Sequence, residues 1–160
     1  MIRAILACDD EWGIGKSGTL PWPHNAADLK WFKEKTSGGI VAMGKATWDS
    51  LPKKPLPGRN NIVITSKIHE DYDAGGYHCI KFENAAASLI SMNKLQDVWI
   101  IGGAQLVVGL MDIIDEFVLS RINGVYECDT FLPRTTIEEL FYLADSGVQG
   151  DVYVDVWRKL

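Results

Sequence analysis

Hydrophobic residues along the chain alternate between two spacings, one typical of buried strands and one typical of helices. Continuous apolar runs predict strands over residues 2–8, 40–43, 61–65, 77–80 and 97–101. The segments between them predict helices over residues 26–36, 45–51, 84–92 and 104–111. Asn25 is a suitable N-cap for the first helix, and Gly38-Gly39 is expected to end it. This alternation predicts parallel strands joined by helical crossovers.

The C-terminal part of the chain carries a different pattern. Residues 116–122, roughly 139–144 and 152–157 all have strand-like spacing, and we expect no helix among them. Successive strands without a crossover helix pair antiparallel. We therefore predict an α/β fold with a mostly parallel central sheet, helices on both faces and an antiparallel C-terminal edge strand. Neither an internal repeat nor a linker interrupts the pattern, so we expect residues 1–160 to form a single domain.

The composition narrows the class of protein. With 160 residues, 47% of them hydrophobic and 23% charged, the chain resembles globular proteins that have one core. No apolar run is long enough to span a bilayer, and the N-terminus reaches acidic residues too early for a signal peptide. Cys8, Cys79 and Cys128 are scattered, which disfavours both a disulfide framework and a zinc site. We therefore expect a cytoplasmic protein with reduced thiols.

The charges are unevenly distributed along the chain. The net charge of −5 disfavours nucleic acid or an anionic membrane as a partner. Within residues 30–60, however, basic residues outnumber acidic ones, namely Lys30, Lys33, Lys35, Lys45, Lys53, Lys54 and Arg59 against Glu34 and Asp49. A locally basic segment in an acidic chain suits a small anionic ligand, although solvated lysines on a helix and a loop explain it equally well.

Two nucleotide-binding motifs are nearly matched after the first strand. Residues 13–18 fit GxGxxG, and Gly15-Lys16-Ser17 resembles the end of a P-loop. The Rossmann motif requires a helix directly after its glycines, whereas Pro21-Trp22-Pro23 intervenes here. Asp10 also occupies the position of the first P-loop glycine. We therefore interpret residues 9–23 as a flexible Gly-rich loop that covers a site.

Asp28 introduces one carboxylate into an apolar helix face. Leu29 and Phe32 share that face by helical spacing. An acid in the first turn commonly serves the helix dipole. The alternative is a carboxylate in an apolar pocket, with a pKa raised by desolvation, that binds the N–H groups of a ligand. The spacing alone leaves both interpretations open.

Gly102-Gly103 lies between an apolar strand and a predicted helix, which indicates either a tight turn or close approach of the backbone to a phosphate. Trp22, Trp31, Trp48 and Trp99 are expected in the core. The three histidines form no spaced set, so we assign them no metal and no catalytic role.

Short segments in a fixed order carry a more specific signal than any single motif. They are Ile14-Gly15, Leu20-Pro21-Trp22, Ala27-Asp28-Leu29, Trp31-Phe32-Lys33, Met43-Gly44-Lys45, Thr47-Trp48, Leu56-Pro57-Gly58-Arg59, Asn61-Ile62-Val63-Ile64, Ile100-Ile101-Gly102-Gly103-Ala104 and Asp129-Thr130-Phe131. In this order and spacing the chain resembles the dihydrofolate reductase family from end to end. The resemblance implies an NADPH-dependent oxidoreductase that reduces 7,8-dihydrofolate to 5,6,7,8-tetrahydrofolate, and we expect a monomer.

The resemblance also implies roles for the substrate site. Asp28 would hydrogen-bond the pterin ring nitrogen and 2-amino group, and Ser120, where the family has threonine, would share that network through its hydroxyl, together with a water. Arg59 would bind the glutamate α-carboxylate of the substrate with its planar guanidinium. The implied catalytic residues are Asp28, Ser120, Leu20 and Trp22. The implied substrate-binding residues are Ile5, Ala7, Asp28, Leu29, Phe32, Leu51, Arg59, Ile101 and Ser120.

For the cofactor, the resemblance places the pyrophosphate at residues 102–104, with a cis peptide between the two glycines, and the 2′-phosphate at Lys45, Thr65 and Ser66. The implied NADPH-binding residues are Ala7, Ile14, Leu20, Gly44, Lys45, Ala46, Thr47, Thr65, Ser66, Ile101, Gly102, Gly103, Ala104, Gln105 and Leu106. No metal is implied. The chain departs from common family residues at Ala46, Ala104, Gln105 and Val107, which predicts fewer contacts with the cofactor.

The implied chemistry is hydride transfer to a carbon next to a ring nitrogen that must be protonated. A dry pocket with one carboxylate favours that protonated state, directly or through ordered water. Two alternatives remain open. A reductase of a ribosylated pyrimidine with the same fold should lack the pairing of Asp28 with Arg59, and a non-catalytic binding protein should have lost the acid or the glycine turn. A fused synthase is not expected in 160 residues.

Overall fold

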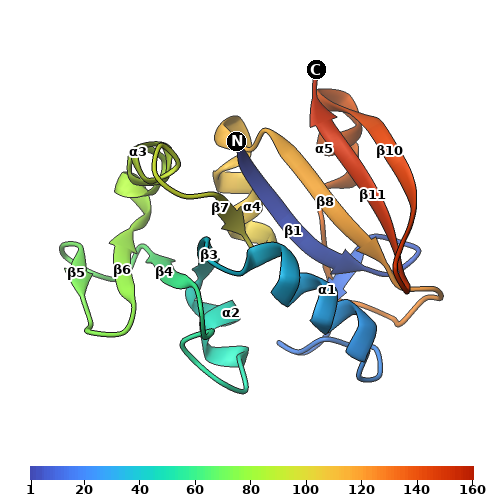
Figure 1. The fold of residues 1–160 in the computed structure, drawn as a ribbon, viewed down its shortest axis with the longest axis horizontal. Helices are drawn as coiled ribbons and strands as arrows, with labels where there is room; N and C mark the ends of the chain where they lie inside the picture. Colours follow the sequence, from blue (N-terminus) through green and yellow to red (C-terminus); the bar gives the residue numbers. More distant parts are fainter.

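A nine-stranded sheet runs through the molecule in the order β10-β11-β8-β1-β7-β3-β4-β6-β5 (Figure 1). The structure is a computed structural model that describes residues 1–160. The strands of this sheet are β1 (Ile2–Cys8), β3 (Ile40–Gly44), β4 (Asn60–Thr65), β5 (Tyr72–Asp73), β6 (His78–Lys81), β7 (Val98–Ile100), β8 (Glu116–Arg121), β10 (Phe141–Gln149) and β11 (Val152–Lys159). A separate two-stranded sheet pairs β2 (Gly13–Gly15) with β9 (Thr130–Phe131).

The helices are α1 (Ala26–Thr36), α2 (Lys45–Ser50), α3 (Phe82–Met92), α4 (Ala104–Gly109), the 3-10 helix η1 (Met111–Ile113) and α5 (Arg134–Leu140). The first of them is capped as predicted, because Asn25 Oδ1 accepts the backbone N–H of Asp28 at 3.0 Å. None of these helices is both long and apolar enough to cross a lipid bilayer.

Strand directions confirm the predicted fold class. β1 is parallel to β7 and β8, and β3 is parallel to β4 and β7. The C-terminal hairpin of β10 and β11 joins β8 antiparallel and forms one edge of the sheet. Both faces of the sheet are covered. Alternate residues of β1 face opposite layers: Leu6 packs in the core that includes α3 and α4, and Ile5 in the core that includes α1 and α2.

The prediction that the C-terminal part contains only strands was wrong, because α5 occupies residues 134–140 before β10 begins. Only Ile137 of this helix is buried, so the sequence has no apolar periodicity there, and an exposed Arg134–Glu138 ion pair supports the helix instead. β10 consequently begins at Phe141 and extends to Gln149, beyond the predicted range. The four tryptophans predicted in the core are all buried.

Candidate functional site

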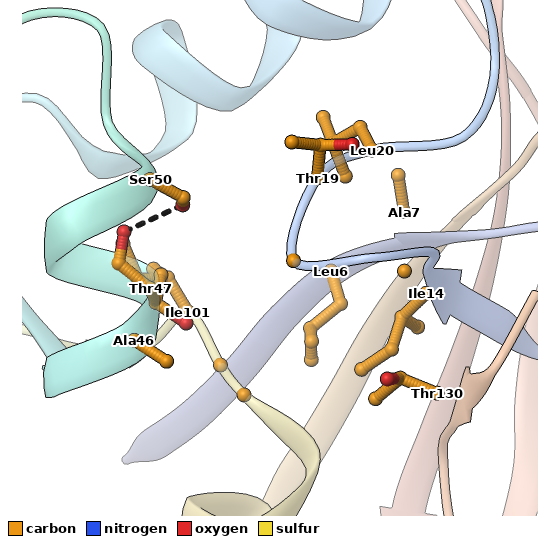
Figure 2. Close-up of a pocket in the computed structure, with 14 residues that line it drawn as sticks. Leu6, Ala7, Ile14, Thr19, Leu20, Ala46, Thr47, Ser50, Ile101 and Thr130 are labelled. Carbon is orange, nitrogen blue, oxygen red and sulfur yellow. Dashed lines mark hydrogen bonds between the residues drawn. The ribbon is translucent and has the colours of Figure 1, made fainter.

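Two adjoining cavities open at the carboxyl ends of β1, β3 and β7, where ligands of open α/β sheets commonly bind. The first has a volume of about 250 Å³ and the second about 650 Å³. Thr47, Gly103 and Thr130 line both cavities, so the two form one continuous groove. Figure 2 shows the first cavity, with Thr19 and Leu20 of the loop on one side, Ala46, Thr47 and Ser50 of α2 across from them, and Thr130 below.

Every residue that the sequence suggested for cofactor binding lines this groove. The first cavity contains Ala7, Ile14, Leu20, Ala46, Thr47, Ile101, Gly102 and Gly103. The second contains Gly44, Lys45, Ala46, Thr47, Thr65, Ser66, Gly103, Ala104, Gln105 and Leu106. The groove therefore has an apolar end near β1, and an end with hydroxyl groups and lysines beside β4.

Gly102 and Gly103 form the floor where the cavities meet. The peptide bond between them is cis, as the family resemblance implied. Gly102 has a φ of 125°, which residues with a side chain rarely adopt. A Cβ at Gly103 would lie 3.6 Å from Thr47 Oγ1 and would fill part of the groove. The backbone at this point is therefore open to a large ligand such as a dinucleotide, whose pyrophosphate needs close approach to the chain.

The second feature of the site is the buried carboxylate of Asp28 in the first turn of α1. Its side chain is buried, and Oδ1 has no hydrogen-bond partner in the protein. Burial raises the pKa of Asp28 above its usual value, and a nearby Ser120 hydroxyl partly opposes that rise. An acid that served only the helix dipole would not need to be desolvated in this way.

Ser120 connects Asp28 to the groove. It lies on β8 opposite Ala7 of β1, and Ala7 lines the first cavity. Its hydroxyl makes only a long contact of 3.5 Å with the Leu6 carbonyl, so it is free to turn toward the carboxylate. Ile5 lies two residues before Ala7 on β1 and is fully buried in the same layer as Phe32, Leu51 and Ile101.

Arg59 lies at the other end of α1, half-buried. Its Nε donates to the Pro57 carbonyl at 3.0 Å, its Nη1 donates to Thr36 Oγ1 at 3.1 Å, and its guanidinium carbon lies 5.8 Å from the centre of the Phe32 ring. Partial burial lowers the pKa of Arg59, and no carboxylate of the protein pairs with it. The side chain is thus fixed in orientation while its charge is not neutralised.

The loop over residues 9–23 is held against the segment before β9. The Ser17 N–H donates to Asp129 Oδ2 at 2.8 Å, and the Asp129 N–H donates to the Gly15 carbonyl at 3.0 Å. Farther along the loop, the ring of Trp22 meets that of Tyr126 edge-on at 6.0 Å. Leu20, by contrast, is 56% exposed at the mouth of the first cavity. The loop therefore combines an anchored base with an exposed apolar tip, as a cover for the groove requires.

Comparison with known proteins identifies the family. The family model described as dihydrofolate reductase matches residues 1–151. This chain belongs to the dihydrofolate reductase family. It is 34% identical to the dihydrofolate reductase of Sus scrofa over 167 residues, which covers 94% of this chain and 89% of that protein. It is 36% identical to the dihydrofolate reductase of Neisseria gonorrhoeae over 133 residues, with coverage of 83% and 79%.

A solved structure of the family has the same fold. The dihydrofolate reductase from Enterococcus faecalis, complexed with NADP(H) and RAB-propyl, superposes with a TM-score of 0.82 at 30% identity. The match covers 99% of this chain and 96% of that one. The predicted membership of the dihydrofolate reductase family and the predicted fold are both confirmed.

Sequence reasoning missed several residues that line the groove. Thr130 borders both cavities, and Lys67 and Phe82 line the second one. Of these three, Thr130 alone had a signal, since it lies in the Asp129-Thr130-Phe131 motif. Of the departures from the family, Ala46 and Gln105 do line the groove, whereas Val107 is fully buried in the core.

Proposed function

We propose that this protein reduces 7,8-dihydrofolate to 5,6,7,8-tetrahydrofolate with NADPH, and that Asp28 is its central catalytic residue. The observation that carries the proposal is the unpartnered Oδ1 of the buried Asp28. Asp28 lies next to Ser120 of β8, and Ser120 is paired with Ala7 of β1, which lines the first cavity. A buried acceptor without a partner is costly unless a ligand supplies the missing donor. The ring N–H and 2-amino groups of a pterin are donors of the required kind.

Asp28 favours protonation of the substrate. An ionised carboxylate in an apolar pocket stabilises a positive charge on the neighbouring pterin ring, and therefore favours the protonated ring nitrogen that hydride transfer requires. Because burial raises the pKa of Asp28, its carboxyl holds a proton more readily than an exposed aspartate does. Ser120 orients the carboxylate and can bridge it to water.

The groove is suited to NADPH, which when bound supplies the hydride. Thr65 and Ser66 offer hydroxyls and Lys45 a positive charge at the 2′-phosphate end. Lys67 adds a second positive charge to the same cavity, whereas Ala46 and Gln105, which also line it, carry no charge. Ile14 and Leu20 provide an apolar cover at the nicotinamide end and exclude water from the transfer. The complex of the Enterococcus faecalis relative with NADP(H) supports this assignment.

Arg59 distinguishes dihydrofolate from smaller substrates. Its charge is not paired within the protein and its orientation is fixed by Pro57 and Thr36, which suits bidentate binding of the glutamate α-carboxylate. Leu29, Phe32 and Leu51 would line the path between the pterin and this tail. A reductase of a ribosylated pyrimidine would have no use for such a cation.

We also propose that the protein works as a single-domain monomer in the cytoplasm. The continuous nine-stranded sheet supports one domain over residues 1–160. The three cysteines are unpaired, and burial raises the pKa of the Cys8 thiol to about 12, which keeps it inert. A gel-filtration experiment with light scattering tests the monomer.

The function is tested by following the absorbance of NADPH with and without dihydrofolate, and by identifying tetrahydrofolate as the product. We expect NADPH oxidation that depends on dihydrofolate, and we expect Asp28→Asn to remove most of it. A ribosylated pyrimidine serves as the competing substrate. NADPH oxidation that is faster with the pyrimidine, or equal in the wild type and Asp28→Asn, would contradict the proposal.

A further inference from the structure

Asp9 is a fully buried carboxylate outside the chemistry described so far. It follows the last residue of β1 directly and begins the loop over residues 9–23, and its exposed fraction is 0%. A buried carboxylate without partners would be strongly destabilising, so its contacts show what it does in the fold.

The two oxygens of Asp9 serve two different segments. Oδ1 accepts from the Glu11 N–H at 2.9 Å and the Gly13 N–H at 2.8 Å, both within its own loop. Oδ2 accepts from the Tyr126 N–H at 3.1 Å and from Cys128 Sγ at 3.4 Å, both in the segment that leads into β9. One side chain therefore links the start of the covering loop to residues 126–128, which are far away in sequence.

Each segment that Asp9 holds continues into the wall of the groove. Gly13 directly precedes Ile14 on one side, and Cys128 lies two residues before Thr130 on the other. The approach at this point is close, because a Cβ at Gly13 would lie 2.4 Å from Cys128 Sγ. Tyr126, whose N–H is held by Asp9, packs in turn against Trp22. A displacement here would reach both the cavity wall and the end of the loop.

The protonation state of Asp9 suits this role. Burial opposes its ionisation, but the N–H groups of Gly13, Tyr126 and Glu11 and the thiol of Cys128 outweigh that effect and lower the pKa of the carboxyl. Asp9 is thus a carboxylate at neutral pH and accepts from all four donors at once.

We propose that Asp9 is a positioning residue for hydride transfer, which holds the loop over residues 9–23 against residues 126–128 so that Ile14 and Thr130 stay in place at the cofactor cavity. This proposal rests on the proposed function, because hydride transfer is the step that it affects. Asp9 makes none of its hydrogen bonds with Asp28.

The decisive variant is Asp9→Asn, which keeps the shape of the side chain but replaces one acceptor oxygen by an NH₂ group. Whichever way the amide turns, that group faces N–H donors of one of the two segments. We expect the single-turnover rate of hydride transfer to fall about 10- to 100-fold, since small misplacements of a reacting pair cost that much. We expect the KM for dihydrofolate to change by less than about 3-fold, and trypsin to cleave after the exposed Lys16 faster.

The matched control is Asp115→Asn. Asp115 Oδ2 accepts the Ile2 N–H at 2.7 Å, so it also holds a backbone group of β1, but at the end of the strand opposite to Asp9. The control should leave the hydride-transfer rate and the cleavage after Lys16 unchanged, whatever it does to the melting temperature. Equal slowing in both variants, or a wild-type rate in folded Asp9→Asn, would overturn the proposal.

A milder pair of variants applies if Asp9→Asn does not fold. Cys128→Ala removes one donor to Asp9, while Cys128→Ser retains a donor, and we expect about 2- to 10-fold slower transfer in the first with recovery in the second. Equal rates in both would count against the role of Asp9. If the wild type oxidised no NADPH with dihydrofolate, the proposed function would fail, whereas the trypsin comparison would still report on the link through Asp9.

Discussion

Asp9 and Asp28 are both carboxylates with almost no exposed surface, yet the protein surrounds them in opposite ways. Asp9 accepts hydrogen bonds from four donors of its own chain, and they lower its pKa despite burial. Asp28 has one oxygen without any partner, and burial raises its pKa. The difference lies in the number of donors around each group, since both sites are desolvated.

This difference separates a group that the fold has satisfied from one that remains available to a ligand. Leaving a buried acceptor unpartnered costs about 1–3 kcal/mol of folding free energy, which is accepted where a bound molecule later supplies the donor. Two positively charged residues show the same contrast. Arg59 forms no ion pair within the protein, whereas Lys45 is already paired with Asp49 on the surface of α2.

The largest effect is expected from the pH profile of Asp28→Asn. The substitution preserves the shape of the pocket but removes the charge, so hydride transfer at neutral pH should fall roughly 100- to 10,000-fold. Lowering the pH should restore part of the rate, because solvent then supplies protonated substrate. Stopped-flow measurement of hydride transfer between about pH 5 and 9 checks this. Asp9→Asn should slow transfer by a nearly constant factor across the same range, and parallel profiles for Asp28→Asn and the wild type would remove Asp28 from the mechanism.

Arg59→Ala tests whether an unpaired positive charge marks ligand contact as reliably as an unpaired carboxylate. Losing one partner of a charge-assisted bidentate pair should weaken dihydrofolate binding by about 2–5 kcal/mol. A pterin without the glutamate tail should bind nearly as before, because it does not reach Arg59. Binding is measured by fluorescence titration of both compounds. Arg158→Ala is the control, since Arg158 is paired with Glu116 at the far end of β8; equal losses for both compounds in Arg59→Ala would make its role structural.

Lys45→Glu should have a smaller effect because Lys45 is exposed and already paired. We expect the preference for NADPH over NADH in kcat/KM to fall by roughly 10-fold, the scale of one hydrogen bond to a charged group. Binding of dihydrofolate should be nearly unchanged. The comparison needs kcat/KM for both cofactors in the wild type, in Lys45→Glu and in Lys94→Glu, an exposed lysine beyond α3. An unchanged preference would assign the 2′-phosphate to Lys67 instead.

The smallest effects should appear in stability, with opposite slopes for the two carboxylates. Asp9 has a lowered pKa, so it stabilises the fold above the unfolded value of about 3.9 and loses that contribution as the pH falls through its folded pKa. Asp28 has a raised pKa, so its contribution is present below about 3.9 and is lost as the pH rises through its folded pKa.

Relative to the wild type, Asp9→Asn should therefore become less stable as the pH rises, and Asp28→Asn more stable. Urea unfolding of the three proteins between about pH 3 and 7 measures both slopes, provided that the m-values agree. Slopes of the same sign would mean that the surroundings of the two carboxylates do not differ as described.

Several parts of the fold follow from local patterns alone. β1, β3, β4 and α1 were predicted within about a residue, because their apolar runs and the Asn25 cap are signals contained in the segment itself. α5 was missed because one buried residue, Ile137, does not create a period. β2, β5 and β9 have two or three residues each and exist only through their partners. No segment of that length has a signal of its own.

The sequence by itself determined the fold class, the family and many of the residues that line the groove, because ordered motifs and hydrophobic periods are properties of neighbouring residues. It left open whether Asp28 served a helix dipole or a ligand, and it gave no role to Asp9. Only the tertiary structure shows how each carboxylate is surrounded, and our proposals for both rest on those surroundings. Burial and hydrogen-bond partners depend on which distant segments meet. Residues 126–128 supply two of the four donors to Asp9, whereas no segment supplies a donor for Oδ1 of Asp28.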